Sequence, residues 1–140
     1  MRKKTQRIDS AAEALLGYAA DARGNGLVYV RVSAAGNRRV LRLPFRIAPS
    51  SDDRAVAYAA LTVTARRLRE RGYRRVRFLL GDARFVSEVA ARSELPAMLV
   101  LPYVRLRCAL NTLEAAGVES GDVDELSARA RAEVALNQAA

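Results

Sequence analysis

Residues 72–89 read GYRRVRFLLGDARFVSEV and carry the clearest structural pattern in the chain. Gly72 is a residue type at which helices commonly end. Residues 74–80 open with arginines and finish in a dense apolar run, which is typical of a strand buried in the middle of a sheet. Gly81-Asp82 follows directly, and the apolar spacing beyond it predicts a helix over 83–92. The segment therefore predicts a helix end, a central strand and a second helix in succession.

A hairpin and a long helix are predicted before this segment. Apolar residues alternate over 27–32 and over 40–47, and turn residues occupy 34–37, so we expect two antiparallel strands. Pro44 cannot donate to a strand ladder, which places the second strand at or near a sheet edge. A loop that ends in helix-capping aspartates then predicts a helix over 54–71. This order indicates an α/β fold with a mixed sheet, an antiparallel hairpin plus a parallel strand, flanked by helices.

Two further helices are predicted toward the C-terminus. Pro102 is well placed to start one of them, which ends near Ala116 with Gly117 as its stop signal. The last helix covers 123–136.

Residues 10–22 admit two interpretations. Ser10 and Glu13 match a capping box, and the alanine-rich stretch that follows has strong helix propensity. The alternative is a buried central strand, in which tertiary packing overrides propensity. Before this stretch, residues 1–8 indicate a flexible basic arm, and residues 9–140 indicate a single domain.

Composition excludes several classes of site. Cys108 is the single cysteine, so an internal disulfide and a multi-cysteine metal site are excluded; we expect it in the core, on an amphipathic helix. The absence of histidine excludes His-based triads and His-ligated zinc. No apolar run approaches the roughly 20 residues that cross a bilayer. The basic N-terminus lacks the apolar part of a secretory signal, so we expect a cytoplasmic protein without a membrane partner.

The charge of the chain favours a polyanionic partner. Lys and Arg number 24 against 15 Asp and Glu, which gives a net charge of +9, and nearly all the cations are arginine. Because the guanidinium forks onto phosphate and stays charged, nucleic acid is the natural candidate. The densest cluster offers four candidate nucleic-acid contacts, Arg66, Arg67, Arg74 and Arg75. The alternative is a solvated basic surface.

The predicted order of elements, with residues 72–89 as its best part, resembles the ribonuclease H family over about residues 14–136. Ala83 stands where many relatives have serine. The resemblance implies a site in which several carboxylates hold two divalent ions, Mg²⁺ or Mn²⁺. One ion activates a water and the other stabilises the leaving oxygen, and the RNA strand of an RNA–DNA hybrid is cut.

The resemblance also implies which residues would be catalytic and hold the metals: Asp21, Asp82 and Asp124. Asp21 fits the family's first aspartate only if residues 10–22 form a strand. Asp82 matches the central aspartate that the two ions share, and Asp124, with Asp122 as a fallback, matches the last. For Asp82 and Asp124 the alternative is an ordinary helix cap. No other cofactor is implied.

The chain departs from the family at two places. The family's helix glutamate falls at Val56 or Ala57, and neither is acidic. Asp53, one turn earlier on the same helical face, is a partial substitute or simply a cap. The strand that the family has before its last helix falls on 117–121, so it is expected to be abbreviated or lost.

These observations predict a ribonuclease H-like protein that binds RNA–DNA hybrid or structured RNA, with metal-dependent cleavage weakened or lost by a degenerate active site. Two alternatives stay open. One is an active, metal-dependent ribonuclease H. The other is a non-catalytic interaction module, such as a homodimer.

Overall fold

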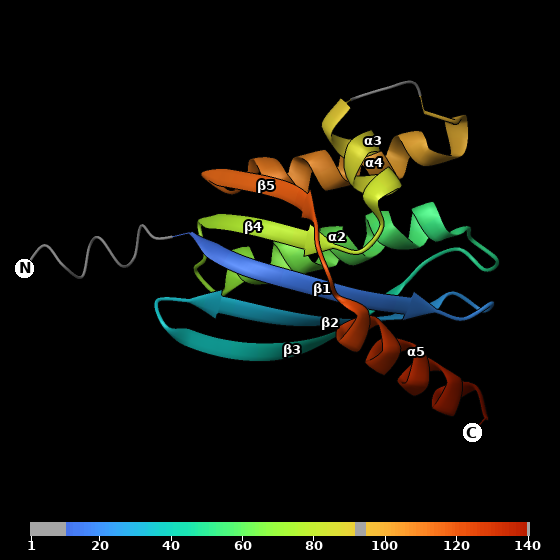
Figure 1. Ribbon diagram of the computed structural model, residues 1–140. Helices are drawn as coiled ribbons and strands as arrows, with labels where there is room; N and C mark the ends of the chain where they lie inside the picture. Colours follow the sequence, from blue (N-terminus) through green and yellow to red (C-terminus); the bar gives the residue numbers. More distant parts are fainter. Residues whose placement is uncertain (1–10, 92–94, 140) are drawn as a thin grey trace, which may run out of the picture.

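The computed structural model describes residues 11–91 and 95–139. A five-stranded sheet in the order β3-β2-β1-β4-β5 forms its centre (Figure 1). The strands are β1 (Ala12–Ala20), β2 (Asn25–Ala34), β3 (Asn37–Arg46), β4 (Arg75–Leu80) and β5 (Ala115–Ser120). β2 pairs antiparallel with β1 and β3, whereas β4 pairs parallel with β1 and β5. The predicted mixed sheet is therefore confirmed.

Helices cover both faces of the sheet, with α5 in front of it and α2 behind it in Figure 1. The helices are α2 (Asp53–Glu70), α3 (Ala83–Ala91), α4 (Ala97–Asn111) and α5 (Asp124–Ala139). The larger core joins α2, α3 and α4 to one face of the sheet. A smaller core packs Leu126 and Ala130 of α5 on Leu27 and Tyr29 of β2. Side chains alternate across a strand, so neighbouring residues of β1 contribute to different cores.

β1 decides between the two interpretations of residues 10–22 in favour of the strand. It lies between β2 and β4 and is hydrogen-bonded to both. Ala12, Ala14 and Leu16 are at most 1% exposed and face the larger core. A central strand with both faces covered gains more from burial and from two ladders than a helix gains from alanine propensity.

The region around α4 and β5 corrects two predictions. The helix begins at Ala97, so Pro102 lies inside it, and it ends at Asn111. The residues predicted to end that helix belong instead to β5, a full six-residue strand that pairs with β4 from Arg75 to Leu80. β5 is a sheet edge with no fully buried side chain. It therefore lacks the buried, alternating pattern by which a strand is recognised in a sequence.

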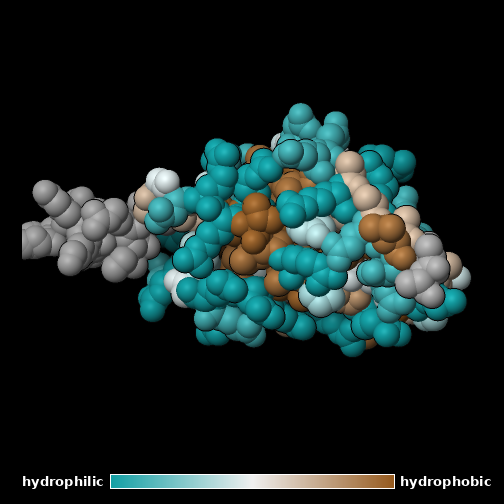
Figure 2. Space-filling model, turned by 90° about the horizontal axis from the view of Figure 1, so that it is seen from below, coloured by the Kyte–Doolittle hydropathy of each residue, from teal (hydrophilic) through white to brown (hydrophobic). Residues whose placement is uncertain are grey.

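The hairpin has the predicted form. Ala35 and Gly36 make the two-residue turn between β2 and β3 with φ values of 50° and 82°, the left-handed conformations that a tight hairpin requires. β3 is the outer strand, as Pro44 predicted. Figure 2, seen from below the β3 edge, shows mainly hydrophilic side chains around a central hydrophobic patch. Val40, the exposed large hydrophobic of β3, is 44% accessible.

The remaining predictions have mixed outcomes. The helices expected over 54–71, 83–92 and 123–136 correspond to α2, α3 and α5, and Gly72 ends α2 with a φ of 98°. Cys108 is exposed on α4, so its predicted place in the core is wrong. The basic arm at 1–8 and residue 92 lie outside the described residues. No described helix has the length and apolarity to cross a bilayer.

Candidate functional site

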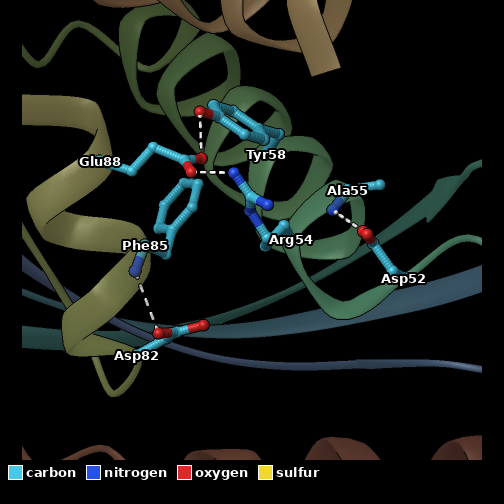
Figure 3. A network of polar contacts seen from close by, with 7 residues as sticks. All are labelled: Asp52, Arg54, Ala55, Tyr58, Asp82, Phe85 and Glu88. Atoms are coloured by element: carbon cyan, nitrogen blue, oxygen red, sulfur yellow. Dashed lines mark hydrogen bonds and ion pairs between the residues drawn. The ribbon is translucent and has the colours of Figure 1, made fainter. Parts of the chain in front are cut away.

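A cleft of about 810 Å³ opens where the first turns of α2 and α3 face each other (Figure 3). α3 follows directly on β4, so the cleft lies at the carboxyl end of a central parallel strand. Ligand sites of open α/β sheets are commonly found at this end of the strands. Its lining residues are Asp52, Asp53, Arg54, Asp82, Ala83, Arg84, Phe85, Ser87 and Glu88.

Asp82 enters the cleft from the end of β4. Its carboxylate accepts a hydrogen bond of 3.0 Å from the backbone N–H of Phe85 (Figure 3). Asp52 has the same role on α2, where its carboxylate accepts a hydrogen bond of 2.9 Å from the backbone N–H of Ala55. Both side chains therefore cap helices, and both line the cleft.

Tyr18 of β1 lies level with Asp82. The parallel register pairs Leu16 of β1 with Leu80 of β4, so the residue two positions further on each strand is Tyr18 on one and Asp82 on the other. The Tyr18 ring packs partly buried against the larger core. Burial, and then the negative charges of Asp82 and Asp53, raise the pKa of its phenol to about 12. Tyr18, Asp53 and Asp82 thus interact electrostatically at one end of the sheet.

Asp21 lies beyond the end of β1 and outside the cleft. Its Oδ1 accepts hydrogen bonds from the backbone N–H groups of Arg23 (2.9 Å) and Asn25 (3.0 Å). The Asn25 bond is the largest cause that holds the Asp21 pKa below its usual range. Asp21 lines a different cavity, together with Arg42 of β3. The structure therefore does not bring Asp21 to Asp82.

Asp124 is also absent from the cleft lining. It is the first residue of α5, is exposed, and its N–H bonds to the Asp122 carboxylate at 3.1 Å. Within residues 11–91 and 95–139, no three acidic, histidine or cysteine side chains lie close enough to hold a metal ion. A two-metal centre needs several carboxylates around both ions. The cleft therefore does not fit the Mg²⁺ or Mn²⁺ pair that the resemblance implies.

Glu88 is the acidic residue of the cleft that the sequence did not single out. It forms an ion pair with Arg54 of α2 and accepts a 2.8 Å hydrogen bond from the Tyr58 hydroxyl (Figure 3). Its side chain is 13% exposed. Burial, and then the hydrogen bond to Glu88, raise the Tyr58 pKa. Glu88 therefore links α3 to α2, and Arg54 balances its charge.

Asp53 is the carboxylate of the cleft left without a bonding partner within the described chain. Asp52 and Asp82 accept backbone hydrogen bonds and Glu88 is ion-paired, whereas no hydrogen bond or ion pair reaches Asp53 from the described residues. Asp53 therefore lines the cleft without an ion pair to any residue of the described chain. Arg84, exposed at the start of α3, is the basic residue of the cleft outside the Arg54–Glu88 pair.

We expect unfolding to become easier in alkaline solution because of Tyr18. Its folded pKa is about 12 against an ordinary value of 10. The stabilising contribution is complete below pH 10 and is lost as the pH rises toward 12, because the unfolded chain releases this proton first. Urea unfolding between pH 10 and 12 should show that the free energy of unfolding falls more steeply with pH for the wild type than for Tyr18→Phe. Equal slopes would contradict the buried, protonated phenol.

Three of the four predicted nucleic-acid contacts are ion-paired, and the fourth lines a groove. Arg67 pairs with Glu70 at 3.4 Å, and Arg74 and Arg75 both reach Glu114, at 3.2 and 3.9 Å. Arg66 lines a separate groove between α2 and α4. Arg75 begins the six-residue strand at whose other end Asp82 follows, so the two lie about 20 Å apart.

Comparison with protein-family models and with curated protein sequences found no match. Solved structures do match. RNase H1 from the archaeon Halobacterium salinarum has a TM-score of 0.71 at 13% identity, over 89% of this chain and 99% of that one. The N-terminal RNase H domain of a Mycobacterium tuberculosis protein has a TM-score of 0.70 at 13% identity, over 91% and 98%. LC11-RNase H1 from compost, in complex with an RNA/DNA hybrid, has a TM-score of 0.65 at 10% identity, over 84% and 89%.

These matches cover most of this chain and most of each matched chain. The five-stranded mixed sheet and its flanking helices are therefore the part of the molecule that is similar. The resemblance found in residues 72–89 therefore holds for the fold. The chain has the ribonuclease H fold.

Proposed function

We propose that this protein binds nucleic acid, as RNA–DNA hybrid or structured RNA, and that its metal-dependent cleavage is weakened or lost. One observation carries the proposal. Tyr18 lies level with Asp82 at the carboxyl end of the central strands, and the described residues provide no third acidic group close enough to complete a metal site. Hydrolysis by two divalent ions needs several carboxylates around the metals, whereas binding of a nucleic acid does not need them.

The charge of the chain supports nucleic acid as the ligand. Its net charge is +9, and a basic protein attracts a phosphate backbone through counterion release. Among the matching structures, LC11-RNase H1 is in complex with an RNA/DNA hybrid. We propose Arg84 as the phosphate contact at the cleft, because it is exposed there and is bonded to no carboxylate of the described chain.

The arginines singled out from the sequence have a smaller proposed role. Arg67, Arg74 and Arg75 each have a glutamate within 4 Å, which a phosphate must displace before it can bind. Exposed ion pairs are weak, so this displacement costs little. We therefore expect these arginines to contribute little, and Arg75 lies about 20 Å from Asp82.

The proposed function is tested with a fluorescein-labelled RNA–DNA hybrid, a structured RNA and a DNA duplex of equal length. Fluorescence anisotropy over a salt series should show binding in EDTA, with affinity that falls steeply as salt rises. Denaturing gels should show intact RNA after incubation with Mg²⁺ or Mn²⁺. Arg84→Ala should reduce the slope of log K against log salt by about 0.9. Arg131→Ala, an exposed arginine of α5 away from the cleft, is the matched control.

Each alternative corresponds to a different result. RNA cleavage that Asp82→Asn abolishes would show an active ribonuclease and overturn the loss of catalysis. The absence of salt-sensitive binding to any of the three nucleic acids would overturn nucleic-acid binding and favour an interaction module.

A further inference from the structure

A second groove, of about 460 Å³, runs between α2 and α4 and ends at the last residues of β3. The groove and the candidate cleft share no lining residue. Its apolar lining includes Phe45 from β3, Val63 from α2, and Met98 and Leu101 from α4.

Met98 and Leu101 begin an apolar strip on the outer side of α4. Met98 is 74% exposed, Leu101 is 56% exposed and Val104 is 46% exposed. Their spacing of three residues places them on one face of the helix. The opposite face of α4 is already buried, through residues that include Leu99 and Leu106. A helix that is apolar on both sides is normally covered on both sides, so its outer strip is typical of a binding surface.

Three arginines also line this groove. Arg46 comes from β3, Arg66 from α2 and Arg105 from α4. Within residues 11–91 and 95–139, none of the three has a carboxylate partner. By contrast, arginines on several other surfaces of the molecule pair with glutamates: Arg31, Arg42, Arg54, Arg67, Arg74 and Arg77. The groove therefore presents uncompensated positive charge around exposed aliphatic side chains.

We propose that this groove binds an acidic amphipathic helix of a partner protein. Apolar side chains on one face of such a helix would cover Met98 and Leu101, and acidic residues beside them would meet the three arginines. Methionine and arginine are both enriched in protein interfaces. The strip from Met98 to Val104 is about 9 Å long, which matches nearly two turns of a helix.

The chemistry of the groove favours this occupant over two others. A nucleic-acid backbone would satisfy the arginines but has no aliphatic groups to cover Met98 and Leu101. A second copy of this chain carries the same charge of +9, so two copies would repel each other. An acidic peptide complements both the charge and the apolar lining.

The test uses a fluorescein-labelled peptide of about 15 residues, with leucines spaced to form one helical face and glutamates beside them. A second peptide carries lysine in place of every glutamate. Anisotropy titrations of the full chain should show binding of the acidic peptide and much weaker binding of the basic one. Arg66→Glu and Leu101→Ser should each weaken binding of the acidic peptide about tenfold or more.

Matched controls come from α5. Arg131→Glu changes the net charge equally, and Leu136→Ser removes a leucine that is even more exposed than Leu101, at 71% accessibility; both should leave peptide affinity unchanged. Equal losses in groove and control variants would overturn the proposal, as would binding of both peptides alike. The same variants are titrated with single-stranded DNA and with RNA–DNA hybrid, and their mass is measured by sedimentation. A loss of nucleic-acid affinity confined to the groove variants, or a dimer that only they dissociate, would also overturn it.

Discussion

Gly17→Ala should detach α5 from the sheet and destabilise the protein by about 3 kcal/mol or more. A Cβ at this position would lie 2.2 Å from the backbone carbonyl carbon of Leu126 and from the backbone nitrogen of Ser127. Both atoms belong to the first turns of α5, so no flexible side chain can move aside. The whole helix must shift, and it would lose the contacts of Leu126 and Ala130 with β2.

Urea unfolding and hydrogen exchange measure this effect. In Gly17→Ala the urea concentration at the unfolding midpoint should fall, and the backbone amides of α5 should exchange faster than those of α2. Gly117→Ala is the matched control, because the nearest atom to its added Cβ is Cγ of Arg77 at 4.0 Å. Should the two alanine variants unfold at the same urea concentration, close packing of α5 on β1 is not what holds that helix.

Tyr58→Ala should destabilise the protein by about 3–5 kcal/mol, because it removes a fully buried ring. The ring has edge-to-face contacts with Phe85 of α3, at 4.8 Å between centroids, and with Tyr103 of α4, at 6.2 Å. Its side chain is 0% exposed. It therefore holds α2, α3 and α4 together beside the cleft, and its loss leaves a cavity among three helices.

Tyr58→Phe separates the ring from its hydroxyl. The ring contacts stay, but Glu88 loses the 2.8 Å hydrogen bond and keeps its ion pair with Arg54. We expect a loss of about 1 kcal/mol in the free energy of unfolding. A loss as large as that of Tyr58→Ala would show that the bond to Glu88, and not the packing of the ring, holds the three helices.

The sequence predicted those elements whose local pattern agrees with their environment. β4 ends in an apolar run because it is central, α2 has an aspartate cap and a glycine stop, and the β2–β3 turn has Gly36, which tolerates left-handed backbone. β5 was missed because an edge strand of small, partly exposed residues has no alternating pattern. Cys108 was misplaced because α4 is apolar on both sides, so periodicity did not tell its inner face from its outer one.

The candidate site depended on tertiary structure to a greater degree. Asp82 could be found from residues 72–89, because it follows the central strand directly. Tyr18 could not, since its place beside Asp82 depends on the register between β1 and β4, which are more than fifty residues apart. Asp21 is three residues beyond that level, and its carboxylate is bonded within its own turn. Glu88 has no local signal either, because its partners Arg54 and Tyr58 lie on another helix.

The amino-acid sequence alone determined the mixed α/β architecture, the basic character of the surface and the position of Asp82. These depend on apolar spacing, composition and neighbours along the chain, all of which act locally. Only the tertiary structure decided that residues 12–20 form a central strand and that Tyr18 interacts electrostatically with Asp53 and Asp82. It also decided that three arginines from different elements line one groove. The physical reason is that strand register and helix packing bring together residues distant in sequence, and no local propensity encodes those distances.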